Sequence, residues 1–287
     1  MTDLHGGPRF FGLERKYMST AQILDLLEEI LAAGSRAILK AMPRGPLDKF
    51  DLAVFERAVS TGDAVRLLLS NDHWETASAA VRQLFELCVH MEHIETYPNR
   101  AAAVARFSEY GDLQQLLGAQ RELQHSHYKG QSASIQDATT IEMALAHPHK
   151  SQFLRTSKDG KRTHWAQSWC DKNLKELCVV SERKLRMMNY EILYSAWSEQ
   201  VHGTPGSLYE RIRFHLSPQP LDYYQALETD RVNGIGTMAV TMLLELWERL
   251  PGSPPGYEAE RHLWATRLTD IGTLHAIDLG SLAQRHT

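Results

Sequence analysis

The chain has 287 residues, a formal net charge of −4 and 43% hydrophobic residues. This length and composition predict a globular protein with a sizeable core. The mildly negative charge argues against a dedicated duplex-DNA binder, which normally carries a strong positive excess. Cys88, Cys170 and Cys178 form no CxxC pair and fall among apolar residues. We therefore expect buried, reduced thiols and a cytoplasmic protein.

The N-terminal part of the sequence predicts a loose arm followed by a helical hairpin over residues 19–66. Residues 1–18 are glycine-rich and aperiodic. An apolar stripe at helical spacing then begins, formed by Ile23, Leu26, Leu27, Ile30 and Leu31. Prolines at 43 and 46 break this first helix, and we expect a second helix from about 47 to 59, stopped by Gly62.

Residues 67–205 predict a core helical domain. Helical patterns cover 74–97, which Pro98 ends, and about 100–127. A loop-rich middle follows from about 129 to 164, with one short helix near 141–147. Further helices are expected at about 168–180 and 182–202. No segment alternates with period two, so we expect less than about 5% strand.

Residues 206–287 predict a C-terminal helical extension packed on the core, with its strongest helix at 238–250. The whole pattern indicates an all-α fold, a bundle of about eight to ten helices. The N-terminus lacks the apolar segment of a secretory signal, and the charge-free stretch 232–244 is too short to span a bilayer. We therefore expect no membrane partner.

A first polar stripe lies along the predicted 74–97 helix. Arg82, Glu86, His90, His93 and Tyr97 recur at intervals of four, four, three and four, which places them along one edge. This stripe is either a solvated face with an Arg–Glu pair or a polar site covered by another helix. In the second case its charges need partners, because unpaired buried charges are costly.

A second polar ladder lies on the predicted 182–202 helix. Tyr190, Tyr194, Ser198 and His202 fall four residues apart, and the remaining positions are almost all apolar. A helix of this kind is buried, so its hydroxyls and imidazole must find partners inside the protein. We predict that Arg82 and Glu86 supply them, although His202 at the helix end would also satisfy terminal carbonyls.

The predicted loop around residue 158 carries basic side chains beside an aromatic one: Lys158, Lys161, Arg162 and Trp165. Basic groups next to aromatics bind single-stranded nucleic acid through phosphate contacts and base stacking. These four residues are candidate nucleic-acid contacts. The alternative is a solvated loop without a ligand.

Metal and cofactor motifs are largely missing from the sequence. Glu86, His90 and His93 share a helix face that would suit one ion, and Glu122-x-x-His125 has the spacing of di-iron bundles but no second copy. No glycine-rich phosphate loop, nucleophile elbow or HExxH motif occurs. We expect no cofactor and no bound metal.

Three segments resemble an uncharacterised bacterial family known as domain of unknown function 5677. They are RQLFELCVHMEHIETYPNRAAAVARFSEY, WCDKNLKEL and YEILYSAWSEQVHG. The resemblance rests on Arg82 and Glu86, on Trp169, and on the ending formed by Tyr194, Ser198, Val201 and His202. It covers roughly residues 70–205 and implies that the two polar stripes belong to one site.

The helical layout and the late histidine also resemble, more distantly, the HEPN group of RNA-cleaving toxins and defence proteins. That group carries Arg-x4–6-His on one helix, usually at a dimer interface, whereas no arginine precedes His202 at that spacing. The resemblance implies a HEPN-like core and a metal-independent ribonuclease acting as a toxin or phage-defence effector, with RNA or a protein as partner and a homodimer as assembly. His202 would be the acid/base group, Arg82 would stabilise charge on the phosphate, and Glu86, Tyr194 and Ser198 would orient them. The alternative is a non-catalytic interaction or regulatory module.

Overall fold

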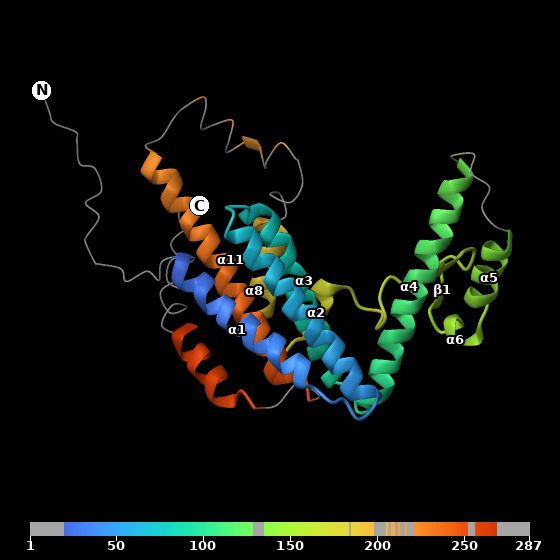
Figure 1. The fold of residues 1–287 in the computed structure, drawn as a ribbon. Helices are drawn as coiled ribbons and strands as arrows, with labels where there is room; N and C mark the ends of the chain where they lie inside the picture. The colour runs from blue at the N-terminus through green and yellow to red at the C-terminus, as the bar shows by residue number, and fades with distance from the viewer. Residues whose placement is uncertain are drawn as a thin grey trace, which may run out of the picture.

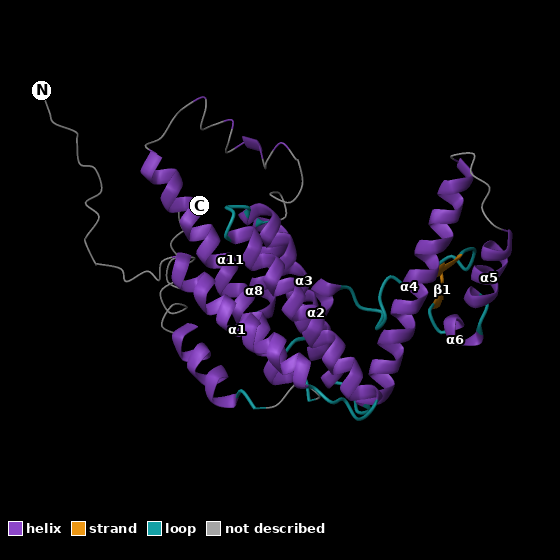
Figure 2. Ribbon diagram, in the orientation of Figure 1, coloured by secondary structure: helices purple, strands orange, loops and turns teal. Residues whose placement is uncertain are grey.

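The computed structural model describes residues 20–128, 135–183, 185–197, 221–251 and 256–268, with a few single residues between 205 and 216. Its elements are α1 (Thr20–Lys40), α2 (Pro46–Leu69), α3 (Trp74–Glu95), α4 (Arg100–Tyr128), α5 (Ile135–Leu145), α6 (Pro148–Ser151), β1 (Leu154–Thr156), β2 (Thr163–Trp165), α7 (Leu174–Val180), α8 (Arg186–Glu191), the π-helical turn η1 (Ile192–Ala196) and α11 (Leu221–Arg249). Residues 258–268 are also helical. The predicted all-α class is confirmed (Figure 2), and the predicted arm 1–18 lies outside the described residues.

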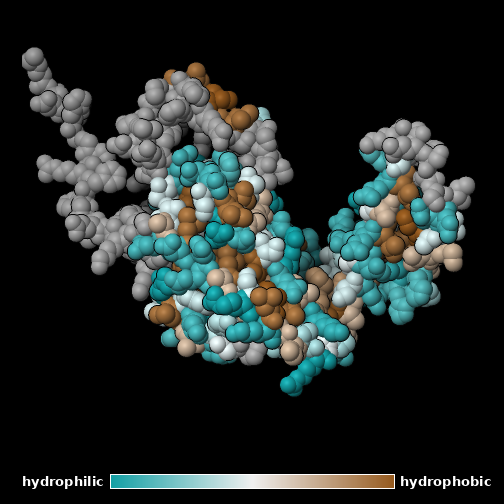
Figure 3. All heavy atoms as spheres, in the orientation of Figure 1, coloured by the Kyte–Doolittle hydropathy of each residue, from teal (hydrophilic) through white to brown (hydrophobic). Residues whose placement is uncertain are grey.

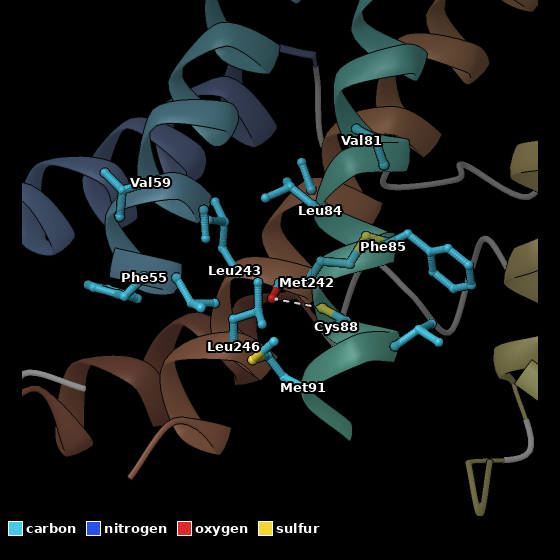
Figure 4. Packing of buried hydrophobic residues seen from close by; sticks show 14 of the residues in the cluster. Phe55, Val59, Val81, Leu84, Phe85, Cys88, Met91, Met242, Leu243 and Leu246 are labelled. Carbon is cyan, nitrogen blue, oxygen red and sulfur yellow. Dashed lines mark hydrogen bonds between the residues drawn. The ribbon is translucent and has the colours of Figure 1, made fainter. Parts of the chain in front are cut away.

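The main body is a bundle in which α1, α2, α3 and α11 pack side by side around one hydrophobic core (Figure 1). Figure 4 shows Leu84 and Cys88 of α3 facing Leu243 and Leu246 of α11. All four side chains are at most 1% exposed. The thiol of Cys88 donates to the carbonyl of Met242 at 3.6 Å, which ties α3 to α11. Apolar burial of this kind is the main source of stability for the fold.

The predicted stripe on the first helix is confirmed, because each of its five members is no more than 5% exposed in α1. The predicted stop at Gly62 is wrong. The helix α2 continues to Leu69, and Gly62 lies within it where α1 and α11 pack against α2. A Cβ at this position would lie 2.8 Å from Leu243 and 2.9 Å from Leu31. The glycine therefore permits close packing rather than ending the helix.

The segment predicted to be loop-rich forms an ordered lobe in its described part, residues 135–164. The helices α5 and α6 and the antiparallel hairpin β1–β2 pack beside the far half of α4, away from the bundle (Figure 1). The two strands are only three residues long, so the sequence shows no alternation with period two. They pair from Leu154–Trp165 to Thr156–Thr163. Figure 3 shows an open hollow between this lobe and the bundle.

The connection from the lobe back to the bundle is fixed by hydrogen bonds to α4. The Arg106 guanidinium donates to the carbonyl of Trp169 at 2.6 Å, and the Tyr110 hydroxyl donates to the carbonyl of Ala166 at 3.0 Å. The helix expected from 168 begins only at Leu174, where Asn173 and Glu176 form a capping box. The helix expected over 182–202 begins only at Arg186 and changes into the π-helical turn η1, and residues 198–202 lie outside the described residues.

The three cysteines are free and buried, as expected from their apolar surroundings. Burial raises the pKa of the Cys178 thiol to about 11 and raises that of Cys88 further, so both are protonated thiols at neutral pH. No helix among the described residues combines the length and the apolar character that crossing a bilayer requires.

Candidate functional site

The two polar stripes meet at Tyr194. The Tyr194 hydroxyl donates a hydrogen bond to the Glu86 carboxylate, and the Arg82 guanidinium carbon lies 4.0 Å from the centre of the Tyr194 ring. Arg82 and Glu86 stand one turn apart on α3, so both reach the same phenol. All three side chains are half-buried. The junction joins segments 108 residues apart in sequence and remains partly open to solvent.

Tyr194 is held in a distorted stretch of helix. It lies in η1, and its ring stacks on Tyr190 with centroids 4.8 Å apart and an angle of 8° between the planes. Lys175 approaches the other tyrosine, at 5.8 Å from the Tyr190 centroid. Burial and the Glu86 carboxylate raise the pKa of the Tyr194 phenol, and Arg82 opposes them only in part. The phenol is therefore a protonated donor at any physiological pH.

Ser198 and His202, the remaining members of the predicted catalytic set, lie outside the described residues. The structure thus brings together Arg82, Glu86 and Tyr194 of the five candidates.

Further along α3, the same polar stripe is covered by an aromatic side chain. The Trp169 indole donates to Nδ1 of His90 at 3.2 Å, and its ring lies 5.5 Å from His93 and 5.7 Å from Tyr97. Burial, with a contribution from His93, lowers the pKa of His90 to about 4. His90 is therefore neutral, and its Nδ1 accepts the hydrogen bond from the indole N–H. At His90, His93 and Tyr97 the stripe is therefore not a fully solvated helix face, which was one of the two interpretations of its sequence pattern.

Beside this stripe lies a buried network of charges that sequence reasoning missed. Arg186 is 3% exposed and bridges Glu92 of α3, at 2.7 Å, and Glu245 of α11. Arg249 and Arg183 also approach Glu245, at 3.3 and 3.4 Å. Burial would raise the pKa of Glu92, but hydrogen bonds from Ser181 and Arg186 lower it overall. The only sequence signal was a lone carboxylate at 245, directly after the charge-free stretch of α11.

The candidate nucleic-acid residues occupy the β1–β2 hairpin. Lys158, Lys161 and Arg162 are exposed in its turn, whereas Trp165 ends β2, half-buried against the core. Their lobe is separated from the bundle that carries Arg82 and Glu86 (Figure 1). The hairpin and the tyrosine junction are therefore two distinct places on the molecule.

Metal ligands do not converge in the part of the chain that the structure describes, where no group of three His, Cys, Asp or Glu residues is placed to hold an ion. Of the trio Glu86, His90 and His93, the first contacts Tyr194 and the second contacts Trp169.

Comparison with known proteins gives one match. The model of the family of unknown function DUF5677 matches residues 52–219, a span that runs from α2 past the tyrosine junction and includes the lobe. No curated protein and no solved structure matched the chain. Because the match covers more than half of the sequence, the chain belongs to the family of unknown function DUF5677.

Proposed function

We propose that the protein is a metal-independent ribonuclease whose active site is built on the junction of Arg82, Glu86 and Tyr194. The observation that carries the proposal is the contact itself. A cation, a carboxylate and a protonated phenol from distant segments converge on one half-buried spot. Tyr194 also lies in a π-helical turn, and such turns are frequent at functional sites. The sequence adds Ser198 and His202 at further four-residue steps.

The chemistry assigned to the site is cleavage of single-stranded RNA by internal transfer. His202 takes the proton of a ribose 2′-hydroxyl, whose oxygen attacks the adjacent phosphorus. The bond to the 5′-oxygen breaks as that oxygen takes a proton from water, and the hydroxide formed is neutralised by the proton that His202 releases. The products are a 2′,3′-cyclic phosphate and a 5′-hydroxyl. Arg82 stabilises the charge that develops on the phosphate oxygens. Glu86, Tyr194 and Ser198 orient these two groups.

The resemblance to the HEPN group of toxins and defence proteins supports this assignment. On the same resemblance we propose a toxin or phage-defence effector as the biological role, with RNA as its substrate. The exposed basic side chains of the hairpin, Lys158, Lys161 and Arg162, would contact the RNA strand. Trp165, the fourth candidate contact, is half-buried against the core.

The alternative is a non-catalytic interaction module. It is favoured by the mutual satisfaction of the three groups at the junction, since Tyr194 already donates to Glu86 and already carries Arg82 over its ring. In that case the junction only fastens η1 to α3. It would contribute about 0.5–1 kcal/mol through the cation–π contact.

The test is cleavage of a fluorescent single-stranded RNA by the purified full chain in the presence of a chelator. We expect the His202→Gln variant to be slower by about 100-fold or more, as for loss of an acid/base group. Arg82→Lys should be slower by about 100-fold, because an ammonium cannot donate the same paired hydrogen bonds to phosphate. A product ending in a 2′,3′-cyclic phosphate would identify the reaction.

Two controls make the experiment selective. Arg36→Lys changes an exposed arginine on α1 and should leave the rate unchanged. A DNA strand of the same sequence lacks the 2′-hydroxyl and should remain intact. Wild-type protein that leaves RNA uncut, combined with a lower free energy of unfolding in Arg82→Lys, would favour the interaction module instead.

A further inference from the structure

A pocket of about 720 Å³ opens between the C-terminal half of α3, the segment from Lys172 to Arg183, and the end of α11. Its size lies within the range of sites for small organic ligands. It is separate from the tyrosine junction, since neither Arg82, Glu86 nor Tyr194 lines it.

Charged side chains of both signs gather at this pocket. Lys172, Arg183 and Arg249 line it, and Arg186 lies buried behind it. The three arginines contact or approach three carboxylates, namely Glu92, Glu95 and Glu245. Glu245 is shared by three guanidinium groups, and with Glu182 of the pocket wall the cluster has four carboxylates for its four cations.

Several polar groups of the pocket wall are left without partners. Among the described residues, the ammonium of Lys172 forms no ion pair, and Nε of Arg249 and Nε2 of His93 are buried without a hydrogen bond. Burial and the nearby Lys172 lower the pKa of His93, so its imidazole is neutral. Buried polar atoms without partners are rare in proteins and indicate a missing one.

The position of Lys172 is fixed by an unusual backbone turn. The preceding residue, Asp171, has a φ of 60°, a backbone conformation that residues other than glycine rarely adopt. Its carboxylate is gripped by Arg155 of β1 through two hydrogen bonds of 2.7 Å. Strain that is held in this way is often found at ligand sites. The hairpin lobe therefore presents Lys172 to the pocket.

The remaining wall is apolar. Val89, Leu177 and Val180 line it. A ligand that fits both parts has an anionic group with several acceptor oxygens and an organic portion. Guanidinium and ammonium groups are the preferred partners of phosphate. A lone inorganic anion would leave most of the volume and the apolar wall unused.

We propose that this pocket binds a small organic phosphate, with the phosphate held by Lys172 and Arg183 and the organic portion lying against Leu177 and Val180. The proposal does not depend on RNA cleavage. Glu182, an exposed carboxylate, also lines the pocket and opposes an anion. Its charge provides a variant that should strengthen binding.

The test is isothermal titration calorimetry of the full chain with adenosine 5′-monophosphate as the probe, and with inorganic phosphate and adenosine for comparison. We expect the monophosphate to bind more tightly than either part. Lys172→Gln and Arg183→Gln should each weaken binding by about tenfold or more. Glu182→Gln should tighten it by a few-fold, a gain that misfolding cannot produce. Arg36→Gln, on a helix that lines no part of the pocket, should bind as the wild type does.

Any of three results would overturn the proposal. One is the absence of binding heat with the monophosphate at millimolar concentration in wild type and Glu182→Gln alike. Another is unchanged affinity in both Lys172→Gln and Arg183→Gln, since the phosphate would then lie elsewhere. Equal affinity for inorganic phosphate and the monophosphate would also refute it, because the apolar wall would take no part. Wild-type RNA cleavage is recorded separately, so failure here leaves the ribonuclease proposal standing.

Discussion

Replacing Arg186 by methionine should destabilise the fold strongly. The side chain is 3% exposed, and its two partners, Glu92 and Glu245, are 13% and 8% exposed. Removing one member of a buried ion pair costs about 3–5 kcal/mol, because the other charge is left in a poor environment. Here Glu245 keeps Arg249 at 3.3 Å, and Glu92 keeps the Ser181 hydroxyl. We therefore expect a loss near the lower end, about 3 kcal/mol.

The assay is urea-induced unfolding followed by tryptophan fluorescence, with Arg36→Met as the exposed control. Combining Arg186→Met with Glu92→Gln should recover about 1 kcal/mol, because the second change removes the unpaired charge. The pH dependence has a definite sign. The folded pKa of Glu92 lies below its ordinary value of 4.5, so its stabilisation is present above pH 4.5 and is lost as the pH falls below it. This acid loss should shrink in Arg186→Met. A cost below about 1 kcal/mol, equal to that of the control, would refute the network.

Two further predictions concern packing and titration. Gly62→Ala should lower the free energy of unfolding by about 1–3 kcal/mol, because the new Cβ would meet Leu31 and Leu243. Gly118→Ala in α4 has open space around the new Cβ and should raise the free energy of unfolding by about 0.5–1 kcal/mol. Equal effects of the two substitutions in thermal or urea unfolding would contradict this packing. The pKa of His90 is about 4 in the folded chain against 6.5 ordinarily, so the unfolded state binds the extra proton between these values and stability falls as the pH drops from 6.5 to 4, by about 3 kcal/mol. His90→Gln, which keeps an acceptor for Trp169, should remove that part of the loss, and an unchanged pH profile would show that His90 titrates normally.

Much of the fold was readable from the sequence because its helices are long and amphipathic. Apolar residues at helical spacing located α1 and α3, and Pro98 marked the end of the latter within a few residues. Gly62 was misread because its role depends on Leu31 and Leu243, which come from other helices. A local pattern cannot distinguish a glycine that ends a helix from one that lets helices approach closely.

The hairpin β1–β2 escaped prediction for a related reason. Strands of three residues are too short to reveal alternation, and the hairpin is held by contacts with α4 and by the ion pairs of Arg155 with Asp171. Tertiary contacts of this kind leave no local signature.

The candidate site was predictable only in part. Four-residue spacing placed Arg82 next to Glu86, and the need of an enclosed tyrosine for partners predicted their approach to Tyr194, which the structure has. The Arg186 network was not foreseeable from spacing, because Glu92 and Glu245 lie on different helices. The organic-phosphate pocket likewise depends on the turn at Asp171, which only tertiary structure fixes.

A double-mutant cycle on RNA cleavage tests most directly whether the two polar stripes form one active site. The rate is measured for wild type, Arg82→Lys, His202→Gln and the double variant under identical conditions. Residues that act as a unit are strongly non-additive, so the double variant should be about as slow as the slower single variant. A double variant whose rate loss equals the product of the two single losses would contradict the shared catalytic site. So would a wild-type chain that does not cleave RNA.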